Sequence, residues 1–173
     1  MKGNEKVIEK LNFLLADELT AISQYMVQAE MCANWGYKEL AEVIEKRAID
    51  EMKHAEKHIG RILFLDGMPV VSDLNKLHIG EDVEAHHKND WEAENGAIKA
   101  YNEAIKLTVE VGDNGTREML ESILKTCNPS LTLCIAADLT LETEWIRSMT
   151  LHEWKKEKPD LHKRPAVFLL GAG

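Results

Sequence analysis

Apolar residues recur every three or four positions along much of this chain, which is the spacing of one face of an α-helix. Over residues 5–34 the apolar stripe is Leu11, Leu14, Ile22, Tyr25 and Ala29. Over 38–64 it is Leu40, Ile44, Ala48, Ala55, Ile59 and Ile62. Over 83–111 it is His87, Trp91, Ile98, Tyr101 and Ile105. A fourth helix is expected to begin near Thr116, so the pattern predicts four helices.

The connections between these helices define the expected architecture. Residues 34–36 read Asn-Trp-Gly and predict a stop and a turn, and residues 112–115 read Gly-Asp-Asn-Gly and predict a second short turn. Residues 65–82 carry no helical period and form a long connection. Short, long and short connections favour an all-α fold, a ferritin-like four-helix bundle with one long crossover.

The end of the chain follows the pattern less well. The fourth helix is expected to break at Pro129, because proline lacks the backbone donor and clashes with the preceding turn. Residues 131–154 are expected to return to helix, and residues 155–173, basic and then apolar and Gly-rich, to form a loose extension. The expected organisation is one bundle domain over 1–154 and an extension over 155–173.

Composition excludes several classes of function. The chain has 173 residues, a net charge of −9 and a pI of about 5.3, which argues against a nucleic-acid partner and suits the attraction of cations. No apolar run reaches the roughly 20 residues needed to span a bilayer, and the N-terminal segment does not resemble a signal peptide. Cys32, Cys127 and Cys134 form no Cys-x-x-Cys pair, which predicts reduced thiols and a cytoplasmic location.

Three of the predicted helices direct acidic side chains at the core. Glu18 lies on the inward stripe of the first helix, Glu51 and His54 lie on that of the second, and Glu94 lies on that of the third. Ionised carboxylates are rarely buried unless they are paired or bind a metal. Inward carboxylates joined by a Glu-x-x-His pair are the pattern of di-iron carboxylate bundles, and oxygen ligands with one imidazole suit iron or manganese, and could also take zinc.

Other potential ligands have simpler interpretations. Met52 points about 100° away from Glu51 around the helix, and the pattern alone favours packing at a helix seam. Four further histidines are expected at solvent or edge positions: His58, His78, His86 and His87.

Several segments closely resemble one family. These are MKGNEKVIEKLN, DELTAISQY, NWGY, DEMKHAEKHIGRILFLDG and LHIGED, which lie within about residues 1–125 and resemble the bacterioferritins, the haem-containing bacterial ferritins. The resemblance implies a cytoplasmic 24-subunit shell that stores ferric mineral. Each subunit would be a four-helix bundle whose di-iron centre oxidises Fe(II) with O₂ or peroxide.

The resemblance also implies roles for individual residues. Glu18 and His54 match terminal iron ligands, Glu51 a bridging ligand, and Glu94 a terminal ligand of the second iron. Met52 matches the axial ligand of a b-type haem that two subunits share at a two-fold interface. Lys46 stands where some members carry a histidine for iron on the inner surface, so that role is not expected here.

The fourth helix departs from the family. Its members carry a second Glu-x-x-His just after a segment like Ile-Leu-Lys, but here the two positions hold Cys127 and Ser130, with Pro129 between them. Three explanations stay open: a frameshift after Lys125, a true variant with a degraded centre, or a shifted helix that supplies a new ligand such as Glu142.

Three functions follow from these observations. The leading one is iron storage with ferroxidase activity, impaired to the extent that the missing second Glu-x-x-His matters. The alternative is a haem-carrying structural subunit with a defective centre, which pairs with a second bacterioferritin chain in a mixed shell. A third is a different di-iron oxidase on a ferritin-like bundle, which absence of haem would favour.

Overall fold

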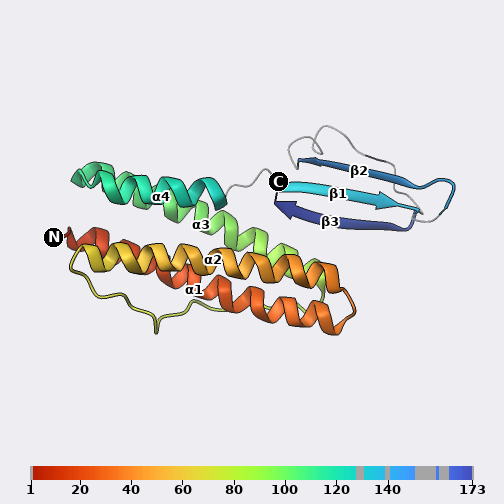
Figure 1. The fold of residues 1–173 in the computed structure, drawn as a ribbon, viewed down its shortest axis with the longest axis horizontal. Helices are drawn as coiled ribbons and strands as arrows, with labels where there is room; N and C mark the ends of the chain where they lie inside the picture. The colour runs from red at the N-terminus through yellow and green to blue at the C-terminus, as the bar shows by residue number, and fades with distance from the viewer. Residues whose placement is uncertain (1, 128–130, 139–140, 151–158, 160–163, 173) are drawn as a thin grey trace. The chain divides into compact units, whose positions relative to one another are not determined.

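The computed structural model describes residues 2–127, 131–138, 141–150, 159 and 164–172. The chain divides into two compact units, Met1–Cys127 and Asn128–Gly173. The first contains the four described helices and the second a small antiparallel sheet (Figure 1). The helical unit thus ends at Cys127, and not near residue 154 as the sequence pattern predicts.

The four helices begin and end close to where the hydrophobic period predicts. They are α1 (Glu5–Asn34), α2 (Lys38–Phe64), α3 (Val83–Val111) and α4 (Asn114–Cys127). α1 packs mainly on α2 and α3 mainly on α4, with α1 also packed on α3 and α2 on α4. This is the predicted four-helix bundle with one long crossover, and none of the described helices is long and apolar enough to cross a bilayer.

Local chemistry fixes the helix ends. The side chain of Asn4 accepts a hydrogen bond from the Lys6 amide (3.0 Å), and that of Asp82 accepts one from the Ala85 amide (2.8 Å), so both act as N-caps. Gly112 ends α3 with a left-handed φ of 74°, a conformation that glycine adopts without a Cβ penalty.

The crossover over residues 65–82 runs along α1 (Figure 1). Three polar side chains of α1 hold its backbone. The Asn12 amide donates to the Met68 carbonyl at 3.1 Å, Thr20 Oγ1 accepts from the Asn75 amide at 2.8 Å, and Gln24 Oε1 accepts from the His78 amide at 3.1 Å. The long connection is therefore an ordered strap on one face of the bundle.

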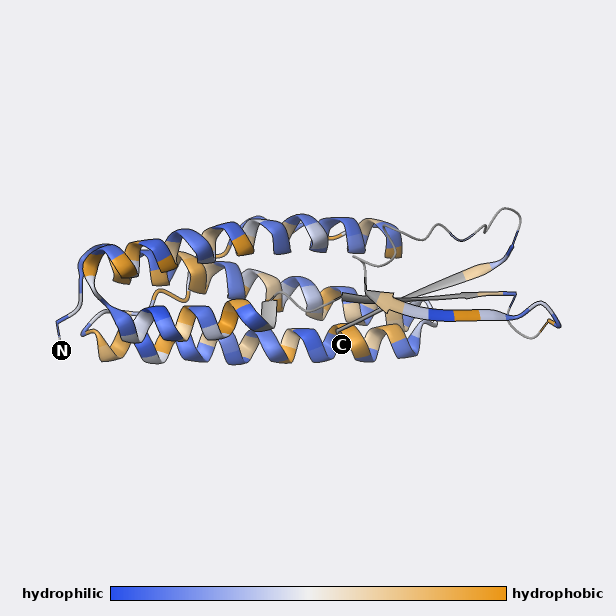
Figure 2. Cartoon of the chain, turned by 90° about the horizontal axis from the view of Figure 1, so that it is seen from above, coloured by the Kyte–Doolittle hydropathy of each residue, from blue (hydrophilic) through white to orange (hydrophobic). Residues whose placement is uncertain are grey.

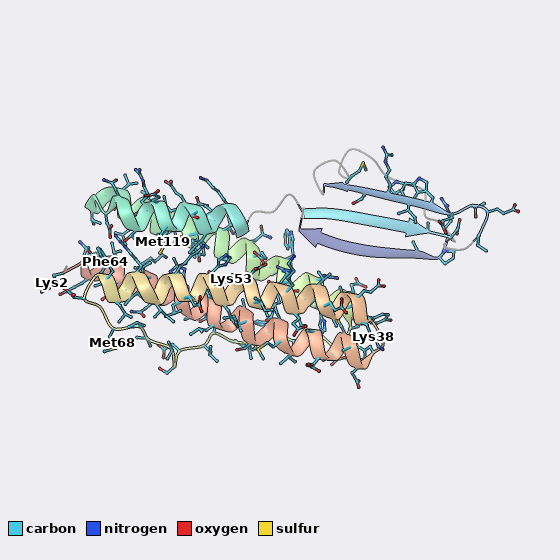
Figure 3. All side chains as sticks on the ribbon, viewed as in Figure 1. Lys2, Lys38, Lys53, Phe64, Met68 and Met119 are labelled. Carbon is cyan, nitrogen blue, oxygen red and sulfur yellow. The ribbon has the colours of Figure 1, made fainter. Side chains whose placement is uncertain are left out.

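The core lies along the inward stripes of all four helices. Polar and apolar positions alternate around each helix (Figure 2), and the largest fully buried side chains are Tyr101, Leu11, Leu14, Leu15, Ile62, Leu65, Leu120 and Ile123. One predicted core residue is misplaced: Trp91 is 61% exposed, at the edge of the α3 stripe. Phe64 and Met68, where α2 passes into the crossover, are also exposed (Figure 3).

The fourth helix is short. α4 has 14 residues against 30 in α1, which correspond to about 21 Å and about 45 Å. It ends at Cys127, two positions before the proline, and Pro129 itself lies outside the described residues. Because α4 runs back along α3, it covers only the C-terminal half of that helix.

The predicted return to helix over residues 131–154 is wrong. The described residues there form β1 (Leu131–Ala137) and β2 (Trp145–Thr150), and β1 also pairs with β3 (Ala166–Ala172). All pairings are antiparallel, in the order β2-β1-β3. The segments contain β-branched and aromatic residues such as Thr132, Ile135 and Trp145, which favour strands once partners satisfy the backbone. Residues 166–172 of the expected loose extension are therefore part of a sheet.

The turn after β1 is held by an acidic side chain. Asp138 has a left-handed φ of 54° and accepts hydrogen bonds from Thr143 Oγ1 (3.0 Å) and Arg164 Nε (2.7 Å). Glu142 is exposed in this same β1–β2 connection. It does not lie on a helix, so the explanation of a shifted fourth helix that supplies Glu142 is wrong.

Candidate metal centre

A cluster of three metal-ligand side chains forms between α1 and α2. Glu51 and His54 are three residues apart on α2 and therefore share one face of the helix, and Glu18 faces them from α1. Each offers one ligand atom, and these atoms lie within 4.8 Å of one another. Among the residues that the structure describes, no other group of three or more His, Cys, Asp or Glu side chains brings its ligand atoms this close together.

The histidine faces both carboxylates. His54 Nδ1 lies 2.7 Å from Glu51 Oε2 and 3.7 Å from Glu18 Oε2. Glu18 and His54 are buried and Glu51 is half-buried, so water can do little to solvate the charges of the group. A divalent cation bound by all three would neutralise that charge.

Burial separates the two carboxyl groups in acidity. Burial raises the pKa of Glu18 to about 7, although its hydrogen bonds with His54 and Tyr101 oppose the shift. Burial also raises the pKa of Glu51, but hydrogen bonds with His54 and Glu18 and the charge of Arg47 outweigh it and leave that pKa below its ordinary value. Near neutral pH Glu51 therefore carries the negative charge and Glu18 shares a proton.

A tyrosine and a second histidine support Glu18 from inside the bundle. The hydroxyl of Tyr101 on α3 donates a short hydrogen bond to Glu18 Oε1 and lies 2.7 Å from His58 Nε2. His58 is fully buried, not at an edge as the sequence pattern predicts, and burial lowers its pKa to about 3. It is a neutral polar partner that fixes Tyr101 and, through it, Glu18. Its spacing of four residues from His54 is a signal for this inward position.

Glu94, the predicted ligand from α3, has a different partner. Its Oε1 accepts a short hydrogen bond from Arg47 Nη2 of α2 and a 3.0 Å bond from the Tyr25 hydroxyl of α1. Burial raises the pKa of Glu94 and the Arg47 charge opposes that shift. Glu94 is therefore not in the three-residue cluster, and its role as a ligand stays a prediction.

One cavity is lined both by carboxylates of the cluster and by Glu94. It has a volume of about 430 Å³, opens between α1, α3 and the crossover, and is lined by five carboxylates: Asp17, Glu18, Glu51, Glu92 and Glu94. Lys76 and His78 of the crossover also line it. The excess of negative charge gives cations an electrostatic advantage on the way to the cluster.

A second buried polar network, which the sequence pattern does not predict, lies further along α1 and α3. Asp90 Oδ1 accepts hydrogen bonds from the side-chain amides of Gln24 and Gln28, both at 2.9 Å. His86 is buried, stacks on Trp35 and lies 3.1 Å from the Gly80 carbonyl oxygen, so its predicted edge position is wrong. These contacts hold the end of the crossover to the bundle.

Met52 projects from the outer side of α2. It is 46% exposed, and Ile49, one turn earlier, is also exposed. The predicted burial of Met52 at a seam within the subunit is not observed. An accessible thioether beside an exposed apolar side chain fits an axial haem ligand at a surface that a second subunit would cover.

The donor set fits one metal ion better than two. Two carboxylates and one imidazole converge at Glu18, Glu51 and His54, a donor set that suits iron. A complete di-iron bundle takes a second Glu-x-x-His from another helix. The described part of α4 ends at Cys127, and the second of the two matching positions, Ser130, lies outside the described residues.

Comparison with known proteins agrees with this geometry. The profile of the ferritin-like domain family matches residues 8–132. A bacterioferritin of Rhodobacter capsulatus is 44% identical over 124 residues, which cover 72% of this chain and 77% of the relative. Bacterioferritins of Brucella melitensis and Mycolicibacterium paratuberculosis are 36% and 39% identical over 124 residues, again 72% of this chain and 77% and 78% of those relatives.

The match stops where the structure changes. Residues 133–173 lie beyond the family profile, and they include most of the sheet unit. The four helices and the three-residue cluster all fall inside or at the edge of the matched region. On the fold, the cluster and the shared sequence, the chain belongs to the bacterioferritins, within the ferritin-like domain family.

Proposed function

We propose that this chain is an iron-storage subunit that binds Fe(II) at Glu18, Glu51 and His54 and oxidises it to Fe(III). The observation that carries the proposal is the convergence of these three side chains within 4.8 Å in a buried site. Carboxylate oxygens favour Fe(III), a hard cation, over Fe(II), and so assist the loss of an electron. O₂ or peroxide would take the electrons.

The acidic cavity is the proposed route for the substrate. Fe(II) would enter past Asp17 and Glu92 and reach Glu18 and Glu51, which line the inner end of the same cavity. Binding displaces the proton from Glu18, since the metal takes the place of the hydrogen. Tyr101 keeps Glu18 in position throughout, because its hydroxyl donates to Glu18 Oε1 from α3 and is itself held by His58.

The remaining family properties are proposals for this chain as well. A b-type haem would bind between two subunits through the thioether of Met52 and its counterpart, and would carry electrons inward when stored iron is released. Twenty-four subunits would form a hollow cytoplasmic shell around the mineral. By the resemblance alone, Glu94 would also hold a second iron ion next to Glu51, a role with which its hydrogen bond from Arg47 competes.

One observation favours a second candidate function. α4 ends at Cys127, so the described bundle lacks the second Glu-x-x-His of a complete di-iron centre. A chain of this kind would act as a haem-carrying structural subunit that needs a competent partner chain to load iron.

Rapid mixing of the full chain with Fe(II) and O₂ separates these functions. We expect a fast rise of Fe(III) absorbance in the unaltered chain, and its loss in Glu51→Gln. The matched control is Glu56→Gln, which removes an exposed carboxylate from the same helix and leaves the fast phase intact. No fast phase in the chain alone, but a fast phase after assembly with a second bacterioferritin chain, would favour the structural subunit.

Haem binding has its own readout. Reconstitution with haem should give the optical bands of a bis-methionine complex, with half a haem per subunit. Met52→Leu should abolish them, whereas Met68→Leu, a change at an exposed methionine of the crossover, should not. Retention of the bands in Met52→Leu would show that Met52 is not the ligand.

A further inference from the structure

Arg47 lies on the same stripe of α2 as the metal cluster. Arg47, Glu51, His54 and His58 follow one another at spacings of four, three and four residues, which keeps all four on one face of the helix. Glu51, His54 and His58 all point inward. A permanently charged guanidinium thus stands one turn from Glu51, at the end of the cluster that faces Glu94.

The guanidinium is fixed by three contacts. Arg47 Nη2 donates a short hydrogen bond to Glu94 Oε1 and a 2.8 Å bond to the Tyr25 hydroxyl. The Tyr25 hydroxyl donates to the same Glu94 oxygen at 3.0 Å, which closes a triangle of hydrogen bonds. Arg47 Cζ also lies 4.5 Å from the centre of the Tyr25 ring, a cation–π contact. Two hydrogen bonds and a cation–π contact therefore hold the Arg47 side chain toward α1 and α3.

This contact crosses the middle of the bundle. α2 and α3 each pack on α1 and on α4, so they face each other diagonally across the core. The Arg47–Glu94 pair therefore spans the gap between α2 and α3, with 34% of the Arg47 side chain and 25% of the Glu94 side chain exposed to solvent. That gap, next to Glu51, is where a second metal ion bound by Glu94 and Glu51 would lie.

The positive charge of Arg47 stabilises the ionised forms of both Glu51 and Glu94. It lowers the pKa of Glu51 and opposes the rise in the pKa of Glu94. Partial burial lowers the pKa of Arg47, but the electrostatic effects of Tyr25 and then of the carboxylates of Glu94, Asp90 and Glu51 outweigh it and raise that pKa, so Arg47 stays protonated. A dication placed between Glu51 and Glu94 would face this fixed positive charge and would have to break the Arg47–Glu94 pair.

We propose that Arg47 takes the place of a second metal ion, as the cation that neutralises Glu94, and makes the centre of this chain mononuclear. This inference rests on the proposed iron site at Glu18, Glu51 and His54 and determines its stoichiometry. Arg47 is a specificity-determining residue and not a ligand. The short α4 is consistent with this role, since its sequence over Asn114–Cys127 carries no second Glu-x-x-His.

Titration of the metal-free full chain with Co²⁺ tests the proposal, because Co²⁺ takes oxygen and nitrogen ligands and its visible bands report coordination. We expect one equivalent per chain, and loss of that equivalent in Glu51→Gln. In Arg47→Gln we expect a second equivalent, bound at least tenfold more tightly than any second equivalent in the unaltered chain. Arg47→Lys keeps the charge and should still bind one.

Two controls make the result specific. Arg47→Gln combined with Glu94→Gln should return the count to one, because Glu94 is the side chain that Arg47 releases. Lys53→Gln removes an exposed cation of α2, paired with Asp50 at 2.7 Å, and should change nothing. Circular dichroism of each variant checks that the bundle is intact.

The titration separates the role of Arg47 from the iron site itself. Two equivalents in the unaltered chain, or one in both the unaltered chain and Arg47→Gln, would overturn the role of Arg47 and leave the iron site standing. No Co²⁺ binding in any variant would overturn the proposed function itself, and with it this inference.

Discussion

Metal binding should release a proton from Glu18. Burial raises the pKa of this carboxyl to about 7, so it is about 90% protonated at pH 6 and about 10% protonated at pH 8. A metal ligand must be deprotonated, and the proton therefore leaves when the metal binds. Glu18 should contribute about 0.9 proton per metal ion at pH 6 and about 0.1 at pH 8.

Calorimetric titration with Co²⁺ in two buffers of different ionisation enthalpy measures this number directly. The value for Glu18→Gln, subtracted from that of the unaltered chain, isolates Glu18 from the other ligands. Where the variant binds too weakly, the unaltered chain alone should release at least about 0.8 proton more at pH 6 than at pH 8. A difference below about 0.3, or a value that does not change with pH, would refute the assignment of a shared proton to Glu18. Glu56→Gln should behave as the unaltered chain.

Three further predictions concern the metal-free chain. Because the pKa of Glu18 is raised, the folded state binds more protons than the unfolded state between pH 4.5 and about 7, so the free energy of unfolding should fall by up to about 3 kcal/mol as pH rises through this window. Denaturant melts of Glu18→Gln should lack this decline. An equal decline in the unaltered chain and in Glu18→Gln would assign the pH dependence to another group. Tyr101→Phe should lower the unfolding free energy by about 2 kcal/mol, because it leaves polar atoms of Glu18 and His58 unpaired in the core, and an unchanged urea midpoint would contradict this. Arg61→Gln removes hydrogen bonds to Asp113 and Thr116 at the start of α4 (2.8 and 2.7 Å), so amide exchange in α4 should quicken before that in α1, unless α4 is held mainly by its apolar stripe.

The sequence predicts the helices well because their apolar stripes are long and regular. The bounds of α1, α2 and α3 coincide with the periodic segments, and Glu18, Glu51 and His54 meet because each lies on an inward stripe. Residues 131–154 were harder for a physical reason. Their apolar residues fit helix and strand periods alike, and only pairing between distant segments decides in favour of strands.

The polar partners inside the bundle could be predicted only in part. His58 lies four residues after His54 and Arg47 four residues before Glu51, so spacing alone places both on the metal-facing stripe. What each side chain binds depends on α3, since Tyr101 and Glu94 are more than 40 positions away in sequence. Trp91 was predicted to be buried and is exposed, because a residue at the edge of an apolar stripe can face either the core or the solvent.

The central claim is that Glu18, Glu51 and His54 hold iron, and anomalous diffraction locates iron most directly. Crystals of the full chain soaked anaerobically with Fe(II) should give one strong anomalous peak at the iron edge within coordination distance of all three side chains, and Glu51→Gln crystals should lose it. Iron bound elsewhere in the bundle, with no peak among these residues, would contradict the account.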